Sequence, residues 1–359
     1  MDGPTPLTQA RHGSGLARTR LAPSPTGQLH LGNARTLLVT WALARHMGWS
    51  VTLRIEDLDP SRTREGDIDR CIDDLRWLGI EWDGSPAIQS TRTGVHLQAL
   101  DALARAGAVY VSAHSRSEIR RASPEQDALH APHGLSSVVR FPPELRPARP
   151  GPGWIASAPR APAAQDTGGD ALAPEGNLRL ALGPGAERVN EHAGTACDAD
   201  PLALFGDPIL WTKAGLPAYH LAVCADDIAQ GVTDVVRGAD LSEAAALHAR
   251  IWRMLGAEPP RWWHLPLLMD TDGQRMSKRQ GSLTVASLRD SGVSPERIAG
   301  FCAWSAGLHG GELAPLPPSS LVAVATPAAV AAWARAPLHS DLAARSALSG
   351  RIIDWLRAG

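Results

Sequence analysis

Residues 20–33, RLAPSPTGQLHLGN, place a single imidazole, that of His30, among turn-forming residues directly before an apolar run of helical period. A loop that leads from the carboxyl edge of a sheet into a helix N-terminus is where α/β folds bind anionic ligands. Gly27 and Gly32 would let a flat ligand approach the backbone, and His30 can donate to a phosphate oxygen that gains charge. The stretch predicts a nucleotide-binding loop. On spacing alone, a Pro–Gly turn with a surface histidine is an equally good interpretation.

A second stretch, DTDGQRMSKRQGS at residues 270–282, contains Lys278 after a predicted turn. Of the 35 basic residues, only Lys213 and Lys278 are lysines, so the chain uses arginine for most of its positive charges. A lysine retained in such a chain indicates a site that needs a compact ammonium on a flexible stem. The stretch fits a loop that delivers an ammonium to a phosphate chain. The alternative is an ordinary charged surface loop.

The residues around the first stretch predict the elements that would hold it. Their periodicity predicts strands at 18–24 and 50–56, and helices at 33–47, 67–79 and 93–106. Strands that alternate with helices in this order are typical of a parallel sheet with helices packed on its faces. The fold class is therefore expected to be α/β.

The later part of the chain is less uniform. A helix is expected at 243–255 and a buried strand at 264–269. Residues 143–176 are rich in Pro, Ala and Gly without a periodic apolar pattern, which predicts a poorly ordered insertion. Residues 311–330 are interpreted as a Pro-rich break, and the Ala-rich residues after them as one or two helices.

Composition narrows the class of protein. The four cysteines lie far apart with no C-x-x-C pair, which argues against a disulfide framework or a cysteine zinc site. No apolar run approaches the roughly 18 residues of a membrane helix, and residues 1–17 lack the apolar centre of a signal peptide. We therefore expect a cytoplasmic protein with a flexible N-terminal arm and no membrane partner. Because the net charge is −2, a nucleic acid would have to bind a local basic surface.

Taken together, the two stretches resemble the paired signatures of class I aminoacyl-tRNA synthetases. HLGN at residues 30–33 resembles the first signature, usually His-x-Gly-His, and RMSKR at 275–279 resembles the second, usually Lys-Met-Ser-Lys-Ser. They lie about 245 residues apart, in the order that the family has. The surrounding text, including RIEDLDPSR, LPAYHLAVCADDIAQGVTDVVRGADL and HLPLLMDTDGQRMSKR, resembles the glutamyl branch of that family.

The resemblance implies a set of substrate contacts. In the glutamyl branch, the position of Arg20 holds the glutamate side-chain carboxylate, and the position of Glu56 pairs with the substrate ammonium. The chemistry is reasonable, because an arginine fork matches a carboxylate. The implied glutamate-binding residues are Arg20, Ala22, Ser24, Glu56, Tyr219 and Arg237. The implied ATP-binding residues are His30, Gly32, Asn33, Met276, Ser277 and Lys278.

Each of these residues also has a simpler interpretation. Arg20 and Arg237 fit surface salt bridges, Glu56 fits the cap of a turn, and Tyr219 fits a core ring. Their joint occurrence in matching motifs favours the functional interpretation, in which His30 and Lys278 carry the catalysis.

The length after the second signature points to one member of the branch. About 80 residues follow Arg279, which is too few for the helical anticodon-binding region of a full glutamyl-tRNA synthetase. The chain is therefore most similar to the glutamyl-Q tRNA(Asp) synthetases, which look like the catalytic half alone. That resemblance implies activation of L-glutamate with ATP and Mg²⁺, and transfer to the queuosine base of tRNA(Asp), by an enzyme expected to be a monomer.

The same resemblance implies a division of the chain. We expect a Rossmann-like catalytic domain in two halves, 18–108 and 201–310, with an acceptor-binding subdomain inserted at 109–200. Residues 311–359 would form a short helical tail in place of an anticodon-binding domain.

Two departures from the family pattern matter. Asn33 replaces the second histidine of the first signature, which the short family tolerates. Ser112 and His114 stand where the family has the C-x-C of a zinc site, with His130 and His133 downstream. Serine is a poor zinc ligand, so we expect a degenerate site without a metal. Packing, or Arg116, Arg120 and Arg121, would then hold the acceptor nucleotide.

Three other functions are compatible with the same residues. The chain could be a divergent, truncated glutamyl-tRNA synthetase that charges a tRNA 3′ end. It could be a non-catalytic binding protein on a synthetase scaffold, although the retained His30, Ser277 and Lys278 argue against decay. It could also be an α/β nucleotidyltransferase that ligates an amino acid to a small molecule.

Overall fold

The computed structural model describes residues 16–122, 140–147, 175–193, 198–269, 283–336 and 349–357, together with residues 345 and 347. The strands are β1 Arg18–Leu21, β2 Ser50–Ile55, β3 Ala87–Ile88, β4 Val109–Ser112, β5 Asn177–Leu180, β6 Ile209–Trp211, β7 Asp234–Gly238 and β8 Arg261–Leu265. The α-helices are α1 Leu31–His46, α2 Asp67–Trp77, α3 Thr93–Arg105, α4 Arg116–Ala122, α5 Pro201–Phe205, α6 Tyr219–Ala229, α7 Ala244–Met254, α8 Val285–Asp290, α9 Pro295–Ser305, α10 Pro318–Val324, α11 Pro327–Ala334 and α13 Gly350–Arg357.

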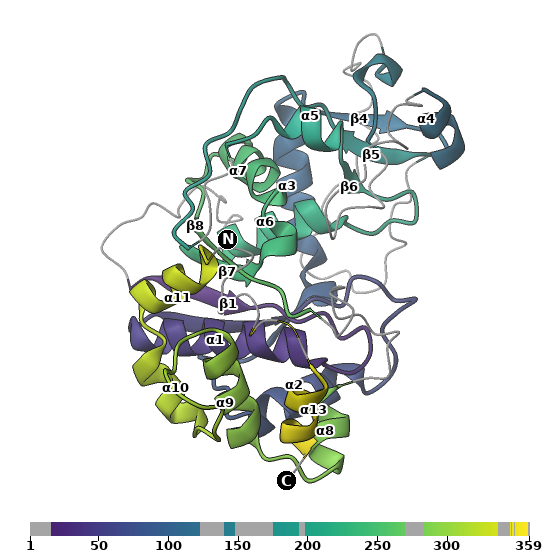
Figure 1. The fold of residues 1–359 in the computed structure, drawn as a ribbon. Coiled ribbons are helices and arrows are strands. Elements are labelled where there is room, and N and C mark those ends of the chain that lie inside the picture. The colour runs from purple at the N-terminus through teal and green to yellow at the C-terminus, as the bar shows by residue number, and fades with distance from the viewer. Residues whose placement is uncertain are drawn as a thin grey trace, which may run out of the picture.

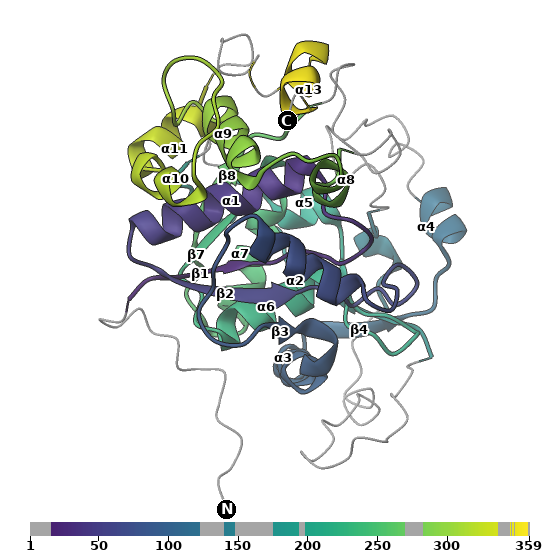
Figure 2. The same cartoon turned by 90° about the horizontal axis from the view of Figure 1, so that it is seen from below.

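Parallel strands form the centre of the molecule. β1, β2 and β3 pair in parallel in that order, and β7 pairs in parallel with β8. The two sets meet beside β1, where the Thr233 amide donates to Arg18 O and the Arg18 amide donates to Thr233 Oγ1, each at 2.9 Å. Figure 2 shows β7, β1 and β2 side by side. The α/β class expected from the sequence, with a parallel sheet and helices packed on its faces (Figure 1), is confirmed.

Helices cover both faces of these strands (Figure 1). On one face lie α1, α2 and the C-terminal helices, which share a large apolar core with β1 and β2. On the other face α3, α6 and α7 enclose a second core that continues into the antiparallel strands. The site described below lies between these two packed layers, so its walls are held by rigid elements.

Helix α1 is buried on almost every side. It begins after His30, whose backbone is extended, and ends before Gly48, which has a φ of +67°. Leu37, Leu38, Trp41 and Leu43 are buried because β1 and β2 lie on one side and α9 and α10 on the other. The helix expected at 33–47 is confirmed, and its N-terminus is fixed in position by this packing.

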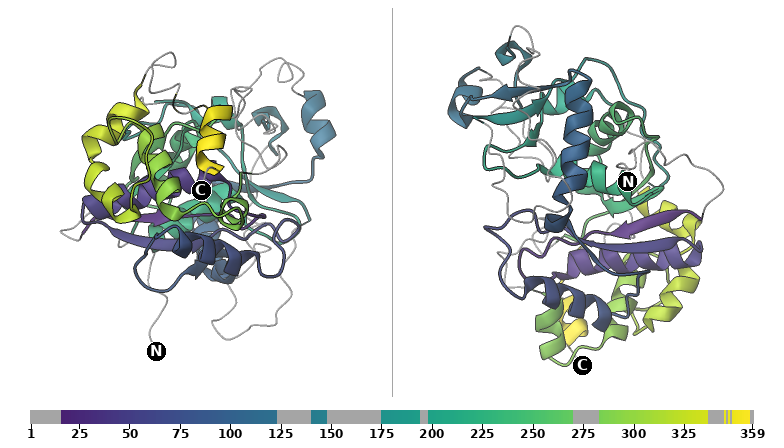
Figure 3. Two further views of the ribbon diagram at one scale, coloured as in Figure 1. Left: turned by 60° about the horizontal axis from the view of Figure 1, so that its bottom comes forward. Right: turned by 180° about the vertical axis from the view of Figure 1, so that it is seen from behind.

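An antiparallel sheet of β4, β5 and β6 follows α3 and stands at the far end of the molecule from the C-terminal helices (Figure 3). Asp207 ties it together: its carboxylate accepts from the Tyr110 hydroxyl at 2.7 Å, from the Leu182 amide at 3.0 Å and from the Arg146 guanidinium. The insertion predicted to start at 143 is wrong at its first residues, because residues 143–145 form a 3₁₀ turn and Arg146 is anchored to Asp207. Residues 148–174 lie outside the described part.

The C-terminal helices correct a second expectation. Residues 311–330 were predicted to be a Pro-rich break, but α10 and the start of α11 lie within them. Proline is compatible with the first turn of a helix, where its missing N–H has no partner to lose, and both helices carry it there. Trp333 of α11 lies 5.0 Å from the guanidinium of buried Arg35 on α1, which joins this layer to the helix that packs on the parallel strands.

The strand predicted at 264–269 is displaced. β8 spans Arg261–Leu265 and ends before Pro266, which has no N–H to donate to a neighbouring strand. Among the helices of the described residues, none has the length and apolar character needed to cross a bilayer.

Asp74 gives a stability prediction that is independent of any activity. It lies on the buried side of α2, and burial raises the pKa of its carboxyl to about 6, with Arg289 opposing the shift. Between pH 4 and pH 6 the folded state therefore holds a proton that the unfolded state has lost, so stability falls as pH rises through this window. We expect Asp74→Asn to raise the free energy of unfolding at pH 7.5 by as much as about 3 kcal/mol, with little gain at pH 4.

Urea unfolding at the two pH values measures this effect. The matched control is Asp73→Asn, because the neighbouring Asp73 side chain is two-thirds exposed and pairs with Arg76 on the surface. Equal stability of wild type and Asp74→Asn at pH 7.5 would show that this carboxyl is not strained by burial.

Candidate active site

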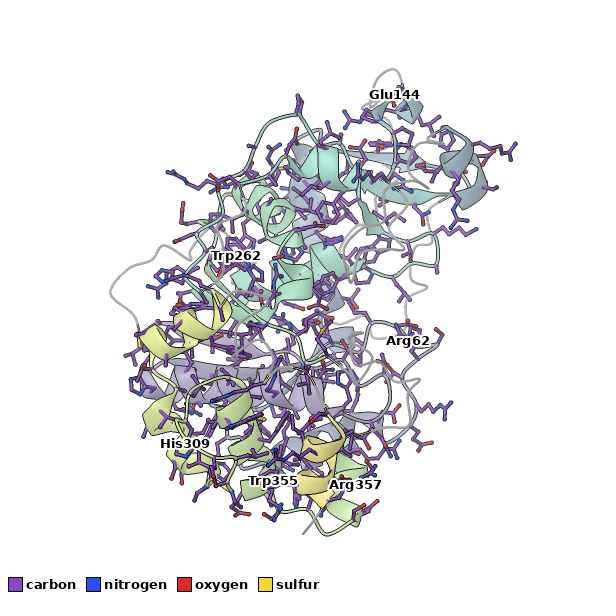
Figure 4. The ribbon with its side chains drawn as sticks, in the orientation of Figure 1. Arg62, Glu144, Trp262, His309, Trp355 and Arg357 are labelled. Carbon is purple, nitrogen blue, oxygen red and sulfur yellow. The ribbon has the colours of Figure 1, made fainter. Side chains whose placement is uncertain are left out.

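A cavity of about 870 Å³ opens where the two sets of parallel strands meet. Its walls include residues that follow the carboxyl ends of β1 and β7, such as Ala22, Ser24 and Asp240. This is the point at which strand connections run in opposite directions, and it is where open α/β sheets bind ligands. Arg62 is one of its lining residues and is labelled at the right of Figure 4. The cavity is large enough for a nucleotide with an amino acid.

The His30 loop forms one wall of the cavity. His30 is the N-cap of α1, and its Nδ1 accepts from the Asn33 amide at 3.2 Å. This bond places the proton of the neutral ring on Nε2, so Nε2 is a donor. A Cβ added to Gly32 would come within 3.2 Å of the imidazole, so glycine is needed for the ring to lie this close. The N-terminus of a 16-residue helix, backed by this donor, suits a phosphate.

The chain that follows the second predicted signature returns to the same wall. The Leu31 amide donates to Leu283 O at 2.9 Å, and the Val285 amide donates to Leu29 O at 2.7 Å. On the other side of the signature, Leu268 also lines the cavity. Met276, Ser277 and Lys278 themselves lie outside the described residues. The residues on both sides of this stretch nevertheless flank the His30 loop.

Two buried arginines share one carboxylate beside the cavity. Arg20 Nε lies 3.2 Å from Asp227 Oδ1, and Arg54 donates to the same oxygen at 2.6 Å. Arg54 also donates to Glu56 at 3.0 Å. Burial alone would lower the pKa of Arg54, but Asp227 and Glu56 raise it, so its charge is secure. Burial is also the main cause of a raised pKa at Glu56, which a ligand cation would counter.

Asp226, beside Asp227, anchors the 3₁₀ turn Gln89–Arg92 that precedes α3. It accepts from Gln89, Arg92 and His96. Burial would raise the pKa of this carboxyl, but the hydrogen bonds and the charge of Arg54 outweigh burial and lower it to about 2. Because Gln89 lines the cavity, this fixed carboxylate holds a second part of the wall in place.

Arg237, at the end of β7, is 6% exposed and has a different set of partners. Its guanidinium donates to His264 Nε2 and to His248 Nδ1, each at 3.1 Å, and to Leu241 O at 2.9 Å. None of these acceptors carries a negative charge. The guanidinium thus reaches the cavity with a full positive charge, which suits an anionic ligand.

Nine of the residues predicted to bind glutamate or ATP line the cavity. The cavity brings together Arg20, Ala22, Ser24, His30, Gly32, Asn33, Glu56, Tyr219 and Arg237. The surface salt-bridge interpretation of Arg20 and Arg237 is wrong, because both are buried. The core interpretation of Tyr219 is also wrong, because this residue is 38% exposed. Whether these residues bind substrate stays a prediction.

Several residues of the site were not predicted from the sequence. Arg54 and Asp227 form its buried ion cluster, and His248 and His264 hold Arg237. Arg54 could have been found, since it precedes Glu56 by two residues in the strand predicted at 50–56 and would share its face there. His248 and His264 come from different elements, and no local pattern brings them together.

Ser112 and His114 do not form a metal site with other described residues. Ser112 Oγ lies 3.3 Å from His114 Nδ1, and the His114 ring packs edge-on against Phe141. Within the described residues, no group of three His, Cys, Asp or Glu side chains is placed to hold a metal ion. His130 and His133 lie outside the described part. A hydroxyl and one imidazole do not fit a tetrahedral zinc site.

Comparison with known proteins agrees with the geometry. Residues 17–142 and 189–307 match the family model "tRNA synthetases class I (E and Q), catalytic domain". A protein of Nitratidesulfovibrio vulgaris named glutamyl-Q tRNA(Asp) synthetase is 38% identical over 304 residues, covering 82% of this chain and 87% of that protein. A protein of the same name from Symbiobacterium thermophilum is 34% identical, covering 92% and 98%.

The fold has a solved counterpart. The crystal structure of a glutamate-tRNA synthetase from Elizabethkingia anophelis is similar, with a TM-score of 0.69 at 21% identity. The likeness covers 95% of this chain and 70% of that one.

Proposed function

Because the chain belongs to the family of class I tRNA synthetases (E and Q), we propose that it activates L-glutamate with ATP and transfers it to the queuosine base of tRNA(Asp). The observation that carries the proposal is one cavity in which the His30 loop meets buried Arg20 and Arg237. The choice of acceptor follows the name of two relatives, glutamyl-Q tRNA(Asp) synthetase. The protein is accordingly a ligase.

Glutamate binds at the arginine side of the cavity. Arg20 holds the side-chain carboxylate, since Asp227 occupies only part of its guanidinium. Arg237 binds another carboxylate oxygen of the glutamate. Glu56 pairs with the α-ammonium of the substrate, and this pair offsets the cost of burying the Glu56 carboxylate. Tyr219 closes the outer side, while Ala22 and Ser24 leave room for the side chain.

Activation takes place at the His30 side. A glutamate α-carboxylate oxygen bonds to the α-phosphorus of ATP, and the bond from that phosphorus to the bridging oxygen breaks, releasing pyrophosphate. The phosphates are stabilised at the start of α1 by His30 Nε2–H and by the helix N-terminus with Gly32 and Asn33. Lys278, with Met276 and Ser277, stabilises them from the second signature. Mg²⁺ is expected to arrive bound to the phosphate oxygens.

Transfer then consumes the adenylate. A hydroxyl oxygen of the queuosine ring bonds to the activated carbonyl carbon, the carbon–oxygen bond to phosphate breaks, and AMP leaves. The hydroxyl proton passes to solvent. Because Ser112 and His114 do not fit a metal, the antiparallel sheet holds the acceptor nucleotide by packing and by Arg120 and Arg121 on α4.

The deciding experiment is labelling of tRNA(Asp). Enzyme, ATP and radioactive glutamate are incubated with tRNA(Asp) that carries queuosine. The matched control is the same tRNA without queuosine. We expect label only on the queuosine form, and retention of that label when the 3′-terminal adenosine has been removed beforehand. Label that requires the 3′ adenosine would instead indicate a glutamyl-tRNA synthetase.

Two further outcomes would overturn the proposal. Glutamate-dependent exchange of pyrophosphate into ATP, without label on any tRNA, would indicate a ligase for a small molecule. Absence of both exchange and labelling would indicate a binding protein.

A further inference from the structure

Arg237 differs from the two buried arginines near it, Arg20 and Arg54, in the charge of its partners. Arg20 and Arg54 each form an ion pair with Asp227. Arg237 forms no ion pair with a carboxylate of any described residue, and its three acceptors are two imidazoles and a carbonyl. An acceptor imidazole must be neutral and must present its lone pair, so the protonation of His264 and His248 decides how Arg237 is held.

Glu191 sets the protonation of His264. It lies on a short segment beside β8, where Asn190 O accepts from the Trp262 amide at 2.8 Å. The Glu191 side chain is 1% exposed and accepts from His264 Nδ1, from the His264 amide at 3.2 Å and from the Ala193 amide at 3.0 Å. A carboxylate only accepts, so the proton of His264 lies on Nδ1. His264 Nε2 is then the lone pair that faces Arg237.

A second series of hydrogen bonds fixes the tautomer of His248 in the same way. Arg237 donates to His248 Nδ1, so the His248 proton lies on Nε2, which lies 3.0 Å from His220 Nδ1. Burial lowers the pKa of His248 well below its usual range and that of His220 to about 4. Burial also lowers the pKa of His264. All three rings are therefore neutral at pH 7.

We propose that Glu191 is a positioning residue for the amino-acid substrate, because it keeps His264 in the tautomer that holds Arg237 in the cavity without neutralising its charge. The inference rests on the proposed function, in which Arg237 binds a carboxylate of glutamate. Glu191 itself does not line the cavity and acts only through His264.

Glu191→Gln tests the inference with an isosteric change. If the amide nitrogen faces His264 Nδ1, the ring must move its proton to Nε2, where it opposes Arg237 Nε–H. If the amide turns over, the nitrogen opposes the amides of Ala193 and His264. We expect the KM for glutamate in ATP–pyrophosphate exchange to rise about 10-fold or more, and the KM for ATP to change less than about 2-fold. Nitrogen-15 shifts of labelled histidine should report the altered ring.

Glu187→Gln is the matched control. Glu187 lies on the same segment, is also largely buried, and pairs with Arg250 and Arg253 of α7 away from the cavity. This variant should lose stability but keep the wild-type KM for glutamate. Equal effects of the two substitutions on that KM would overturn the inference.

A double variant separates positioning from packing. The substitution His264→Gln offers Arg237 a carbonyl oxygen that does not depend on a tautomer. Combined with Glu191→Gln, it should therefore restore the KM for glutamate to within about 3-fold of wild type. A KM that stays raised in the double variant, or one that is normal in Glu191→Gln, would overturn the inference. Absence of exchange in the wild type would contradict the proposed function instead.

Discussion

Replacing Lys278 by Ala should lower the rate of glutamate-dependent ATP–pyrophosphate exchange about 100-fold. Charge builds on the phosphate oxygens as the bond to pyrophosphate breaks, and loss of one positioned donor in such a site costs about this much. The residues on either side of the RMSKR stretch support the role, because Leu268 lines the cavity and Leu283 bonds to Leu31 at the start of α1. The loss should appear mainly in kcat, since the interaction strengthens in the transition state.

The chain offers a matched control in its second lysine. Lys213 is exposed and lies outside the cavity, so Lys213→Ala removes the same charge from a different place. Exchange by this variant should equal that of the wild type. If Lys278→Ala also exchanged at the wild-type rate, Lys278 would have no part in activation.

Arg20→Gln should reduce kcat/KM for glutamate in the same assay by about 100-fold to 1000-fold, through loss of a charge-assisted pair with the substrate carboxylate. The fold should survive the change. Asp227 keeps its 2.6 Å bond to Arg54 when Arg20 is lost, so no buried carboxylate is left without a cation. The KM for ATP should stay near its wild-type value, because the His30 wall is untouched.

Arg18→Gln controls for the loss of a strand arginine. Arg18 precedes Arg20 by two residues on β1 and bonds to Gln230 O, but it does not line the cavity. We expect this variant to keep the wild-type kcat/KM. Thermal melting of both variants checks the fold, and a folded Arg20→Gln with unchanged kinetics would mean that another residue binds the side-chain carboxylate of glutamate.

Much of the fold could be predicted because local pattern determines it. The apolar periods of residues 33–47 and 67–79 correspond closely to α1 and α2. Each error has a physical cause. Pro266 ends β8 earlier than the apolar run ends, and proline begins α10 and α11 where composition indicated a break. Arg146 is ordered by a buried aspartate 61 residues further along the chain, which its Pro-rich surroundings do not reveal.

The site was predictable only in part. The predicted site residues that the structure describes line one cavity, because the carboxyl ends of parallel strands meet at one edge. The residues that orient them were missed. Glu191, His248 and His264 are held together by β8, α7 and a short segment beside β8, and their spacing has no meaning until the chain has folded. The groups that contact Arg237 are the neutral imidazoles of His248 and His264, and a search for pairs of opposite charge does not find them.

A crystal structure with a non-hydrolysable sulfamoyl analogue of glutamyl-adenylate tests the central claim most directly. The glutamyl carboxylate of the analogue should lie against Arg20, with Arg237 and Glu56 around the amino-acid group. The sulfamoyl group should lie at the N-terminus of α1 within hydrogen-bonding distance of His30 Nε2 and of Lys278. An analogue bound outside this cavity, or bound with its glutamyl group away from both arginines, would contradict the account.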